Sequence, residues 1–218
     1  MRRKPFSARV VLLDWDGTLL NSYAADVRAY RTMFRAMDIR WNLREWRANY
    51  TPNWYAMYEA AGISNAKWPE ANRVWRAAIE LQRPPLLPGA RSVLRLLRRD
   101  FVLGIVTSGS RDRVKRQIAT HKLGDHFSAF VYSEDSSRKK PDPAPLQIAL
   151  KRLRARAEDC VYVGDAPEDI EMARHAGVRA IGIPGPFPTV DRLRAAKPEL
   201  LLRSIRELPG YLRAIARS

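Results

Sequence analysis

Two aspartates, one residue apart, follow a short apolar run near the start of the chain. Residues 10–20 are VVLLDWDGTLL, which places Asp14 and Asp16 between the apolar run and a turn at Gly17. Carboxylates this close repel one another and lose hydration, so such a pair usually holds a cation. If residues 10–13 form a central strand, both acids lie at its C-terminal end, where open α/β sheets bind ligands.

A hydroxyl-rich turn follows a second apolar run. Residues 102–106 lead into Thr107, Ser108 and Gly109, and Ser110 is expected to cap the helix that begins there. Backbone N–H groups at the start of a helix bind phosphate oxygens, and hydroxyl groups add further donors. The turn therefore predicts a phosphate-binding site.

A lysine and a second pair of aspartates complete the set. Lys140 belongs to the segment RKKPDP at 138–143, whose prolines stiffen a loop that can aim the lysine inward as a fixed charge. Asp165 directly follows the apolar run 160–164, and Asp169 comes one helical turn later. All of these groups fall near predicted C-terminal ends of strands.

Each feature has an ordinary explanation when taken singly: a helix cap, a solvated lysine, or acids that favour a helix N-terminus. Their combination points to chemistry. Four carboxylates and one lysine, with no histidine near them, argue against a serine or cysteine hydrolase triad. They suit Mg²⁺ and an aspartate that attacks phosphorus to form an aspartyl-phosphate. The metal, the lysine and the amide donors would offset the phosphoryl charge.

The elements that position these groups alternate between strand-like and helix-like runs. Such alternation predicts a parallel sheet with helices on both faces. The expected strands are Arg9–Leu13, Val102–Val106, Ala129–Tyr132, Cys160–Val163 and Ala180–Ile183. The expected helices are Ala90–Arg99, Arg111–His121, Pro145–Leu153 and Glu168–Ala176, the last of them ended by Gly177.

The first connection is too long for a simple crossover, because no convincing strand occurs between Leu20 and Pro88. We predict a helical domain at 20–85, inserted into a catalytic core made of 1–19 and 86–218. Its expected helices are Ala24–Met37, Leu43–Tyr50, Trp54–Ala61 and Trp68–Leu81. The insert holds five of the six tryptophans, and we expect most of them to pack its own small core. Its position over the carboxylate pair suggests a lid.

Composition bounds the function class. The net charge of +16 favours anionic partners, but the arginines recur along helical segments such as 91–99 and 111–116, which is typical of a solvated surface. No RNA-binding, zinc-finger or basic-zipper signature supports a nucleic-acid partner. The single cysteine, Cys160, is expected to be a buried structural thiol. The basic start MRRKPF lacks a signal-peptide h-region and no membrane span is evident, so we expect a cytoplasmic protein.

The four motifs resemble those of the haloacid dehalogenase-like hydrolase superfamily, in its phosphoglycolate phosphatase-like branch. DWDGTLLNS, VTSGS, KKPDP and VGDAPED match the first to fourth motifs, so the resemblance covers essentially the whole chain. It implies a Rossmann-like, three-layer α/β core with an inserted helical cap. It also implies a Mg²⁺-dependent phosphatase that acts on a small phosphorylated metabolite.

The resemblance implies a role for each residue by position. Asp14 would be the nucleophile and a metal ligand, and Asp16 the general acid and base as well as a metal ligand through its carbonyl. Both would reach one phosphoryl group because alternate residues of a strand point to the same side. Thr107 would hold the phosphoryl group with the Ser108 and Gly109 amides, and Lys140, rather than Lys139, would neutralise charge. Asp165 would bind Mg²⁺, Asp169 would orient Lys140 or a metal-bound water, and Thr18 would set the position of Asp16.

Three questions stay open. Asp16 favours phosphoryl transfer, because the dehalogenases of this superfamily lack an acid at that position. A β-phosphoglucomutase-like phosphotransferase shares all four motifs, and a basic nucleic-acid-binding protein with vestigial catalysis is a distant alternative.

The substrate is not identified, since Asn21 and Ser108 depart from the common pattern. Phosphoglycolate, sugar phosphates, nucleotides and pyrophosphate are candidates, with Arg44, Tyr50, Asn53 and Trp54 of the insert as candidate specificity residues. The oligomeric state is unknown.

Overall fold

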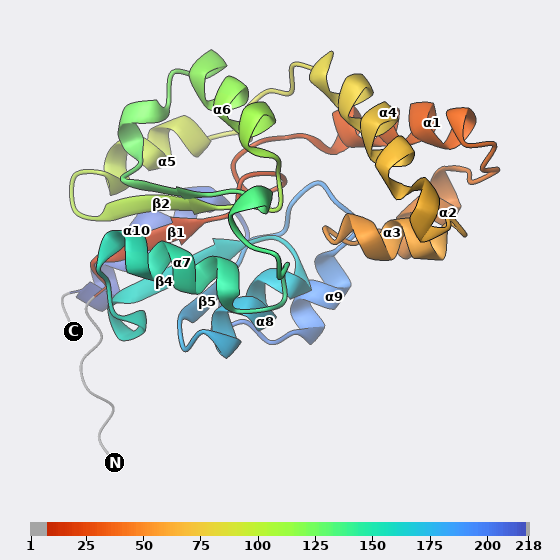
Figure 1. Cartoon of the computed structure of the whole chain (residues 1–218). Helices are drawn as coiled ribbons and strands as arrows, with labels where there is room; N and C mark the ends of the chain where they lie inside the picture. Colours follow the sequence, from red (N-terminus) through yellow and green to blue (C-terminus); the bar gives the residue numbers. More distant parts are fainter. Residues whose placement is uncertain (1–7, 217–218) are drawn as a thin grey trace.

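A six-stranded parallel sheet organises the chain in the computed structural model, which describes residues 8–216 (Figure 1). The basic segment at 1–7 lies outside this range. From one edge to the other, the strands are β3 (Ala129–Val131), β2 (Val102–Val106), β1 (Val10–Leu13), β4 (Cys160–Gly164), β5 (Arg179–Gly182) and β6 (Leu200–Leu201). The five expected strands are confirmed. The sixth was missed because two half-exposed leucines carry no periodic signal.

Helices cover both faces of the sheet, which confirms the three-layer α/β fold. Val11 and Leu13 of β1 pack with one set of helices and Val10 and Leu12 with the other, because successive strand residues face opposite sides. The first set is α5 (Ala90–Leu97), α6 (Arg111–Thr120) and α10 (Leu208–Ala216). The second is α7 (Ala144–Leu153), α8 (Pro167–His175) and α9 (Val190–Ala195).

The central position of β1 determines where the site forms. β1 pairs with β2 on one side and with β4 on the other, and all four of its residues are buried. The chain order therefore reverses across β1, and ligands of open parallel sheets bind at such a switch point. Cys160 is fully buried at the start of β4, as expected.

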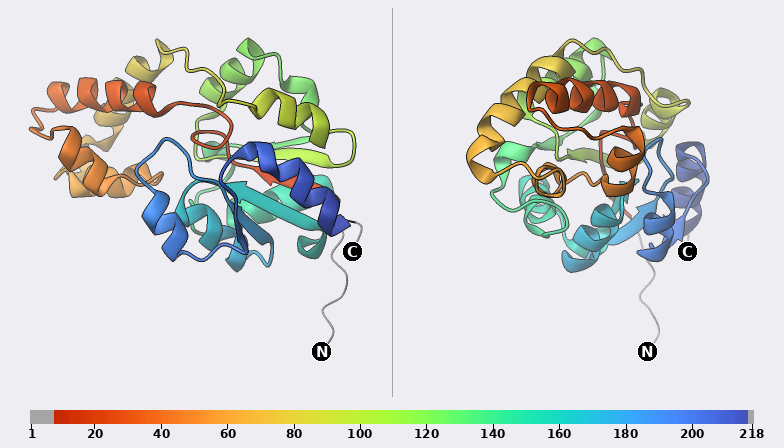
Figure 2. Two further views of the ribbon diagram at one scale, coloured as in Figure 1. Left: turned by 180° about the vertical axis from the view of Figure 1, so that it is seen from behind. Right: turned by 90° about the vertical axis from the view of Figure 1, so that its right-hand side faces the viewer.

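Four helices between β1 and β2 form a separate layer to one side of the sheet (Figures 1 and 2). They are α1 (Tyr23–Ala36), α2 (Leu43–Asn49), α3 (Trp54–Ala60) and α4 (Trp68–Glu80). Trp46 is buried in their apolar cluster, and the other tryptophans of this segment pack against it. The expectation that these tryptophans build a local core is therefore confirmed.

The remaining helices are short or were not expected. Each helix predicted from the sequence is present, within two residues at either end, whereas α9 and α10 were missed. Five 3₁₀ turns occur in the connections: η1 (Asn65–Lys67), η2 (Gly124–His126), η3 (Ser133–Asp135), η4 (Ala157–Asp159) and η5 (Ile205–Glu207). None of the helices between residues 8 and 216 is both long and apolar enough to span a bilayer.

Candidate active site

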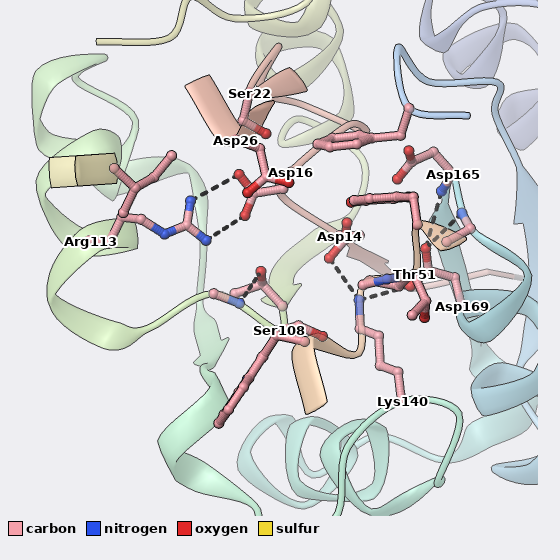
Figure 3. A pocket seen from close by; sticks show the side chains of 18 of the residues that line it. Asp14, Asp16, Ser22, Asp26, Thr51, Ser108, Arg113, Lys140, Asp165 and Asp169 are labelled. Carbon is pink, nitrogen blue, oxygen red and sulfur yellow. Dashed lines mark hydrogen bonds and ion pairs between the residues drawn. The ribbon is translucent and has the colours of Figure 1, made fainter. Parts of the chain in front are cut away.

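The four predicted motifs meet in one cavity of about 90 Å³ (Figure 3). Asp14 follows β1, Thr107 follows β2 and Asp165 follows β4, so the parallel sheet brings three strand ends to the same edge. Lys140 comes from the loop before α7, and Asp169 from the first turn of α8. The structure thus brings together groups that are more than 150 residues apart in the chain.

Lys140 is the centre of a buried hydrogen-bond network. Its Nζ donates to Asp14 Oδ1 and to Asp169 Oδ1, both at 2.7 Å, and to the Tyr162 hydroxyl at 2.8 Å. Three acceptors satisfy the three protons of the ammonium group. The Tyr162 hydroxyl in turn lies 2.9 Å from the Val106 carbonyl oxygen and 3.1 Å from Asp169 Oδ1. Lys140 therefore has a single fixed position.

Excess negative charge remains around this lysine. Burial raises the pKa of Asp14 to about 7, although Lys140 opposes the shift. Burial, Asp14 and Asp169 all raise the pKa of Asp165. Burial lowers the pKa of Lys140, but Asp14 and Asp169 more than offset this and leave its pKa above the ordinary value. Three buried carboxylates thus face one ammonium group, which leaves a charge that a cation could balance.

Both carboxylate oxygens of Asp169 already accept hydrogen bonds from other residues. Its Oδ1 accepts from Lys140, and its Oδ2 accepts from the backbone amides of Asp165 and Ala166 at 3.2 and 3.1 Å. This arrangement fits a group that orients Lys140 and leaves less capacity for a metal.

A divalent cation fits the other two acids. Carboxylate oxygens of Asp14, Asp165 and Asp169 lie within 4.8 Å of one another. Asp14 and Asp165 each keep an oxygen outside the hydrogen bonds formed by the described residues, and such hard oxygen ligands suit Mg²⁺. Thr18 donates to Asp165 Oδ1 at 3.2 Å, so this threonine steadies Asp165 instead of Asp16, its expected partner.

Gly17 explains this change of partner. Its φ of +84° reverses the chain and lays the backbone directly against Asp165. A Cβ atom at Gly17 would lie 2.3 Å from Asp165 Oδ2, so no other residue fits without displacing that carboxylate. The glycine of the first motif thus shapes the cation site on the neighbouring strand.

Asp16 takes a different direction from Asp14. Strand β1 ends at Leu13, so Asp16 lies beyond the strand, in the turn, and strand alternation does not align the two carboxylates, although both line the cavity. Its Oδ1 and Oδ2 accept from Arg113 Nη1 and Nη2 at 2.9 and 2.6 Å. Burial raises the pKa of Asp16, but the Arg113 charge outweighs it and keeps the pKa below its usual range.

Arg113 corrects a second expectation. The sequence placed it among solvated arginines, yet it is only 7% exposed and lies against the cavity. Its neighbours on α6 explain why: Gln117 Oε1 accepts from Trp15 Nε1 at 2.9 Å and forms a longer contact with Arg113 Nη1 at 3.4 Å. The position in the first turns of α6 points this one arginine at the strand end, while Arg116 remains exposed.

The turn after β2 forms one wall of the cavity. Thr107, Ser108 and Gly109 all line it, as expected. The Gly109 amide donates to Thr107 Oγ1 at 3.0 Å, so it is occupied by the protein instead of facing the cavity as a free donor. The Thr107 hydroxyl keeps its own proton for another acceptor.

The inserted helices supply the opposite wall. Asp26 and Tyr30 of α1, Trp75 of α4, Tyr50 directly after α2, and Trp54 at the start of α3 line the cavity. Two of the four candidate specificity residues therefore reach it. Arg44 is exposed on α2, and the Asn53 side chain accepts from the Tyr55 amide as the N-cap of α3. Neither of these two lines the cavity.

Contacts from the insert to the core hold this wall in place. Thr51 donates to Glu168 Oε1 at 2.6 Å, and the Tyr50 ring stacks on Phe187 with centroids 4.7 Å apart. On the other side, Arg116 of α6 pairs with Glu80 of α4 at 2.9 Å. The insert thus covers the carboxylates from both flanks.

Three residues of the site escaped the sequence analysis: two line the cavity, and Tyr162 lies behind it against Lys140. Tyr162 is an inner strand residue, Asp26 resembles a helix N-terminal acid, and Arg113 is one arginine among many. Only the spacing of Asp26 carries a signal, since it lies one helical turn after Ser22 at the exit from the first motif. Their roles depend on which neighbours the fold supplies.

Comparison with known proteins agrees with this geometry. The profile of the haloacid dehalogenase-like hydrolase family matches residues 11–183. A protein of Dickeya dadantii named "Probable phosphatase IndB" is 28% identical, over 94% of both chains. A phosphoglycolate phosphatase of Pseudomonas fluorescens is 26% identical, over 94% of this chain and 80% of its own.

Solved structures share the fold. A haloacid dehalogenase-like family hydrolase of Streptococcus pneumoniae superposes with a TM-score of 0.81 at 20% identity, over 94% of this chain and 98% of that one. The profile match spans every predicted motif, from the Asp14 strand to β5. The chain belongs to the haloacid dehalogenase-like hydrolase family.

Proposed function

We propose that the protein is a Mg²⁺-dependent phosphatase that hydrolyses a small phosphorylated metabolite through an aspartyl-phosphate on Asp14. The observation that carries the proposal is the position of Lys140, whose buried ammonium group joins Asp14 to Asp169 with two hydrogen bonds of 2.7 Å. A nucleophilic carboxylate must be ionised, and an adjacent fixed cation favours its ionised form.

Asp14 has the freedom that an attacking group needs. Lys140 holds Oδ1, so the other carboxylate oxygen is the one that would form the bond to phosphorus, and Oδ1 would use its second lone pair toward Mg²⁺. Thr107 and the Ser108 segment lie across the cavity, where a hydroxyl and backbone donors would bind the phosphoryl oxygens. Mg²⁺, held by Asp14, Asp165 and the Asp16 carbonyl, would add positive charge that offsets the charge of the phosphoryl group.

Asp16 would transfer the proton. It would protonate the leaving oxygen when the ester bond breaks and then accept a proton from the water that hydrolyses the acyl-phosphate. In the described structure Arg113 holds Asp16 as a carboxylate, so Asp16 must exchange this ion pair for the substrate before it acts as an acid. We infer that residues 20–85 act as the cap that delivers the substrate and excludes water during these steps.

The test is phosphate release from 4-nitrophenyl phosphate with and without MgCl₂, comparing the wild type with Asp14→Asn and with Asp191→Asn as a surface control. Asp191 is 90% exposed on α9 and lies outside the cavity. We expect Asp14→Asn to lose at least about 1000-fold in kcat and to form no phosphoryl-enzyme detectable by intact mass. Unchanged turnover in Asp14→Asn would overturn the nucleophile assignment.

Hydrolysis and phosphoryl transfer are separated by the fate of the phosphoryl group. Incubation with a hexose 1-phosphate gives free phosphate if water is the acceptor and the isomeric hexose 6-phosphate if a sugar is. We expect free phosphate. Accumulation of the isomer without phosphate would make the protein a phosphomutase on the same catalytic residues.

A further inference from the structure

The cavity extends past Asp16 into a region that the four motifs reach only through Ser22, the last residue of the first motif. Figure 3 shows Ser22 and Asp26 beyond Asp16, at the end away from Lys140. Trp75 and Tyr30 line the same cavity from α4 and α1. With the phosphoryl group placed between Asp14 and Thr107, this region faces the part of the substrate that leaves.

Asp26 lies in this region without a partner. Its carboxylate forms no hydrogen bond or ion pair with residues 8–216, although it lines the cavity together with Tyr30 and Trp75. Burial raises its pKa to about 8, Asp16 adds to the shift, and Arg113 opposes it, so the group is a carboxylate above this pH and a neutral carboxyl group below it. The ionised form needs an N–H or O–H donor, and residues 8–216 supply none.

Two residues that line the same cavity, Ser22 and Trp75, carry buried donors without a partner. Trp75 Nε1 has no hydrogen-bond partner among the described residues. Ser22 Oγ lies beside Asp16 and helps to hold its pKa down, although no hydrogen bond of acceptable geometry joins the two. Buried polar groups are almost always paired, so two buried donors left over in one cavity, together with the half-buried carboxyl group of Asp26, indicate a polar ligand. Such a ligand carries both hydrogen-bond donors and acceptors.

Where Asp26 is ionised, the charges that line the cavity disfavour a second anion on that ligand. Five carboxylates line the cavity, from Asp14, Asp16, Asp26, Asp165 and Asp169, against two cations. Both cations are used, because Lys140 pairs with Asp14 and Asp169 and Arg113 with both oxygens of Asp16. A second, smaller cavity shares Trp75 and Ser108 with this one and is lined by Arg76. Arg76 lies 3.8 Å from Glu134, so this arginine is also partnered.

We infer that Asp26 in its ionised form selects the leaving group: it accepts a hydrogen bond from a hydroxyl or ammonium group of the substrate and disfavours leaving groups with a second anionic charge. This inference rests on the proposed phosphatase function. It predicts that the chain differs from the Pseudomonas fluorescens relative named phosphoglycolate phosphatase, because 2-phosphoglycolate would place its carboxylate against Asp26. Pyrophosphate, whose leaving group is itself an anion, is disfavoured for the same reason.

Three esters of matched size, assayed above pH 8 where Asp26 is ionised, test the inference: 2-phosphoglycolate, 2-hydroxyethyl phosphate and phosphoethanolamine. They share a two-carbon leaving group that ends in a carboxylate, a hydroxyl or an ammonium group. We expect kcat/KM of the wild type to be at least about 10-fold higher for the hydroxyl or ammonium ester than for 2-phosphoglycolate, since like charges at close range oppose binding. The ratio between the two favoured esters identifies the donor that Asp26 accepts.

Asp26→Asn keeps the side-chain size and removes its charge. We expect the discrimination against 2-phosphoglycolate to shrink about 10-fold in this variant, because an amide no longer repels the carboxylate. Asp191→Asn is the matched control: Asp191 is likewise a first-turn acid, of α9, but exposed, and its replacement should leave all three ratios unchanged.

The outcomes separate the inference from the function on which it rests. If 4-nitrophenyl phosphate is hydrolysed but the wild type prefers 2-phosphoglycolate, or if Asp26→Asn leaves the ratios unchanged, the inference is wrong and the phosphatase function stands. If no ester releases phosphate, 4-nitrophenyl phosphate included, the proposed function fails and the inference fails with it.

Discussion

Arg113 donates a hydrogen bond from each of its two terminal nitrogens to Asp16, at 2.9 and 2.6 Å. The two aspartates of the first motif are therefore paired with different cations. Asp14 belongs to Lys140 and Asp16 to Arg113. Two adjacent carboxylates thereby acquire opposite pKa shifts: burial raises that of Asp14, and Arg113 lowers that of Asp16 against the effect of burial. Such a division fits one nucleophile and one group that exchanges a proton.

Removing Arg113 should affect both stability and the pH profile. Arg113→Gln leaves Asp16 without its cation, and we expect the free energy of unfolding to fall by about 3 kcal/mol, as for other broken buried pairs. Because Arg113 holds the pKa of Asp16 down, the variant's Asp16 pKa rises, and the limb of the pH–rate profile that follows protonated Asp16 moves to higher pH.

Arg116→Gln is the control for this change on the same helix. The Arg116 side chain is 54% exposed and pairs with Glu80, so its loss should cost at most about 1 kcal/mol in urea unfolding and leave the pH profile in place. Equal destabilisation by the two variants would contradict the buried role of Arg113.

Tyr162 should position Lys140. Tyr162→Phe removes the hydroxyl that accepts from Lys140 at 2.8 Å, and the ammonium group gains freedom between Asp14 and Asp169. We expect unfolding to be easier by about 1–2 kcal/mol and kcat to fall roughly 10-fold with little change in KM. Tyr211→Phe, on the distant helix α10, should change neither kcat nor KM. A loss in KM alone would instead assign Tyr162 to substrate binding.

Gly17 should be irreplaceable because of both its positive φ and its close contact with Asp165. Gly62, which has a positive φ but no such contact, separates the two effects. Gly17→Ala strains a φ of +84° and places a Cβ 2.3 Å from Asp165 Oδ2, whereas Gly62→Ala strains a φ of +72° with no heavy atom within 4 Å. We expect Gly62→Ala to cost about 1 kcal/mol from the backbone alone. Gly17→Ala should cost more in thermal unfolding and should also weaken Mg²⁺ binding, measured by titration calorimetry. Normal Mg²⁺ affinity in that variant would argue against Asp165 as a ligand.

Mg²⁺ should stabilise the protein more at high pH. The pKa of Asp14 rises from an ordinary 3.8 to about 7 on folding, so the metal-free folded state holds a proton that the unfolded state releases. The stability from this group is therefore present at low pH and lost as the pH rises through about 7. A bound cation replaces that proton, so saturation to 100 times Kd should add about 2.7 kcal/mol near pH 8 and less near pH 5.5.

Thermal unfolding with and without MgCl₂ at the two pH values measures this difference. Asp165→Asn removes one proposed ligand and should abolish the dependence on Mg²⁺ at both. An equal gain at the two pH values would mean that the cation binds away from the buried carboxylates.

Much of the fold was predictable because local sequence patterns specify its strands and helices. The buried strands β1, β2 and β4 are continuous apolar runs, and the helices between them have amphipathic periodicity. The site residues from Asp14 to Asp169 follow these elements at fixed offsets, and parallel strands must bring their ends to one edge. Elements with a weak pattern, such as β6 and the six-residue helix α9, were missed for the same reason.

The sequence by itself determined which groups gather at the sheet edge, because the spacing of the motifs and the succession of strands and helices along the chain are local properties. Only the tertiary structure decided how those groups are paired. Arg113 and Arg116 are the same residue type on one helix, yet one is buried against Asp16 and the other exposed. Asp26 is a candidate specificity residue only because the fold places α1 beside the cavity, where the Asp26 side chain has no partner among the described residues. Pairing, burial and pKa depend on neighbours from distant segments, and a single sequence does not list those neighbours.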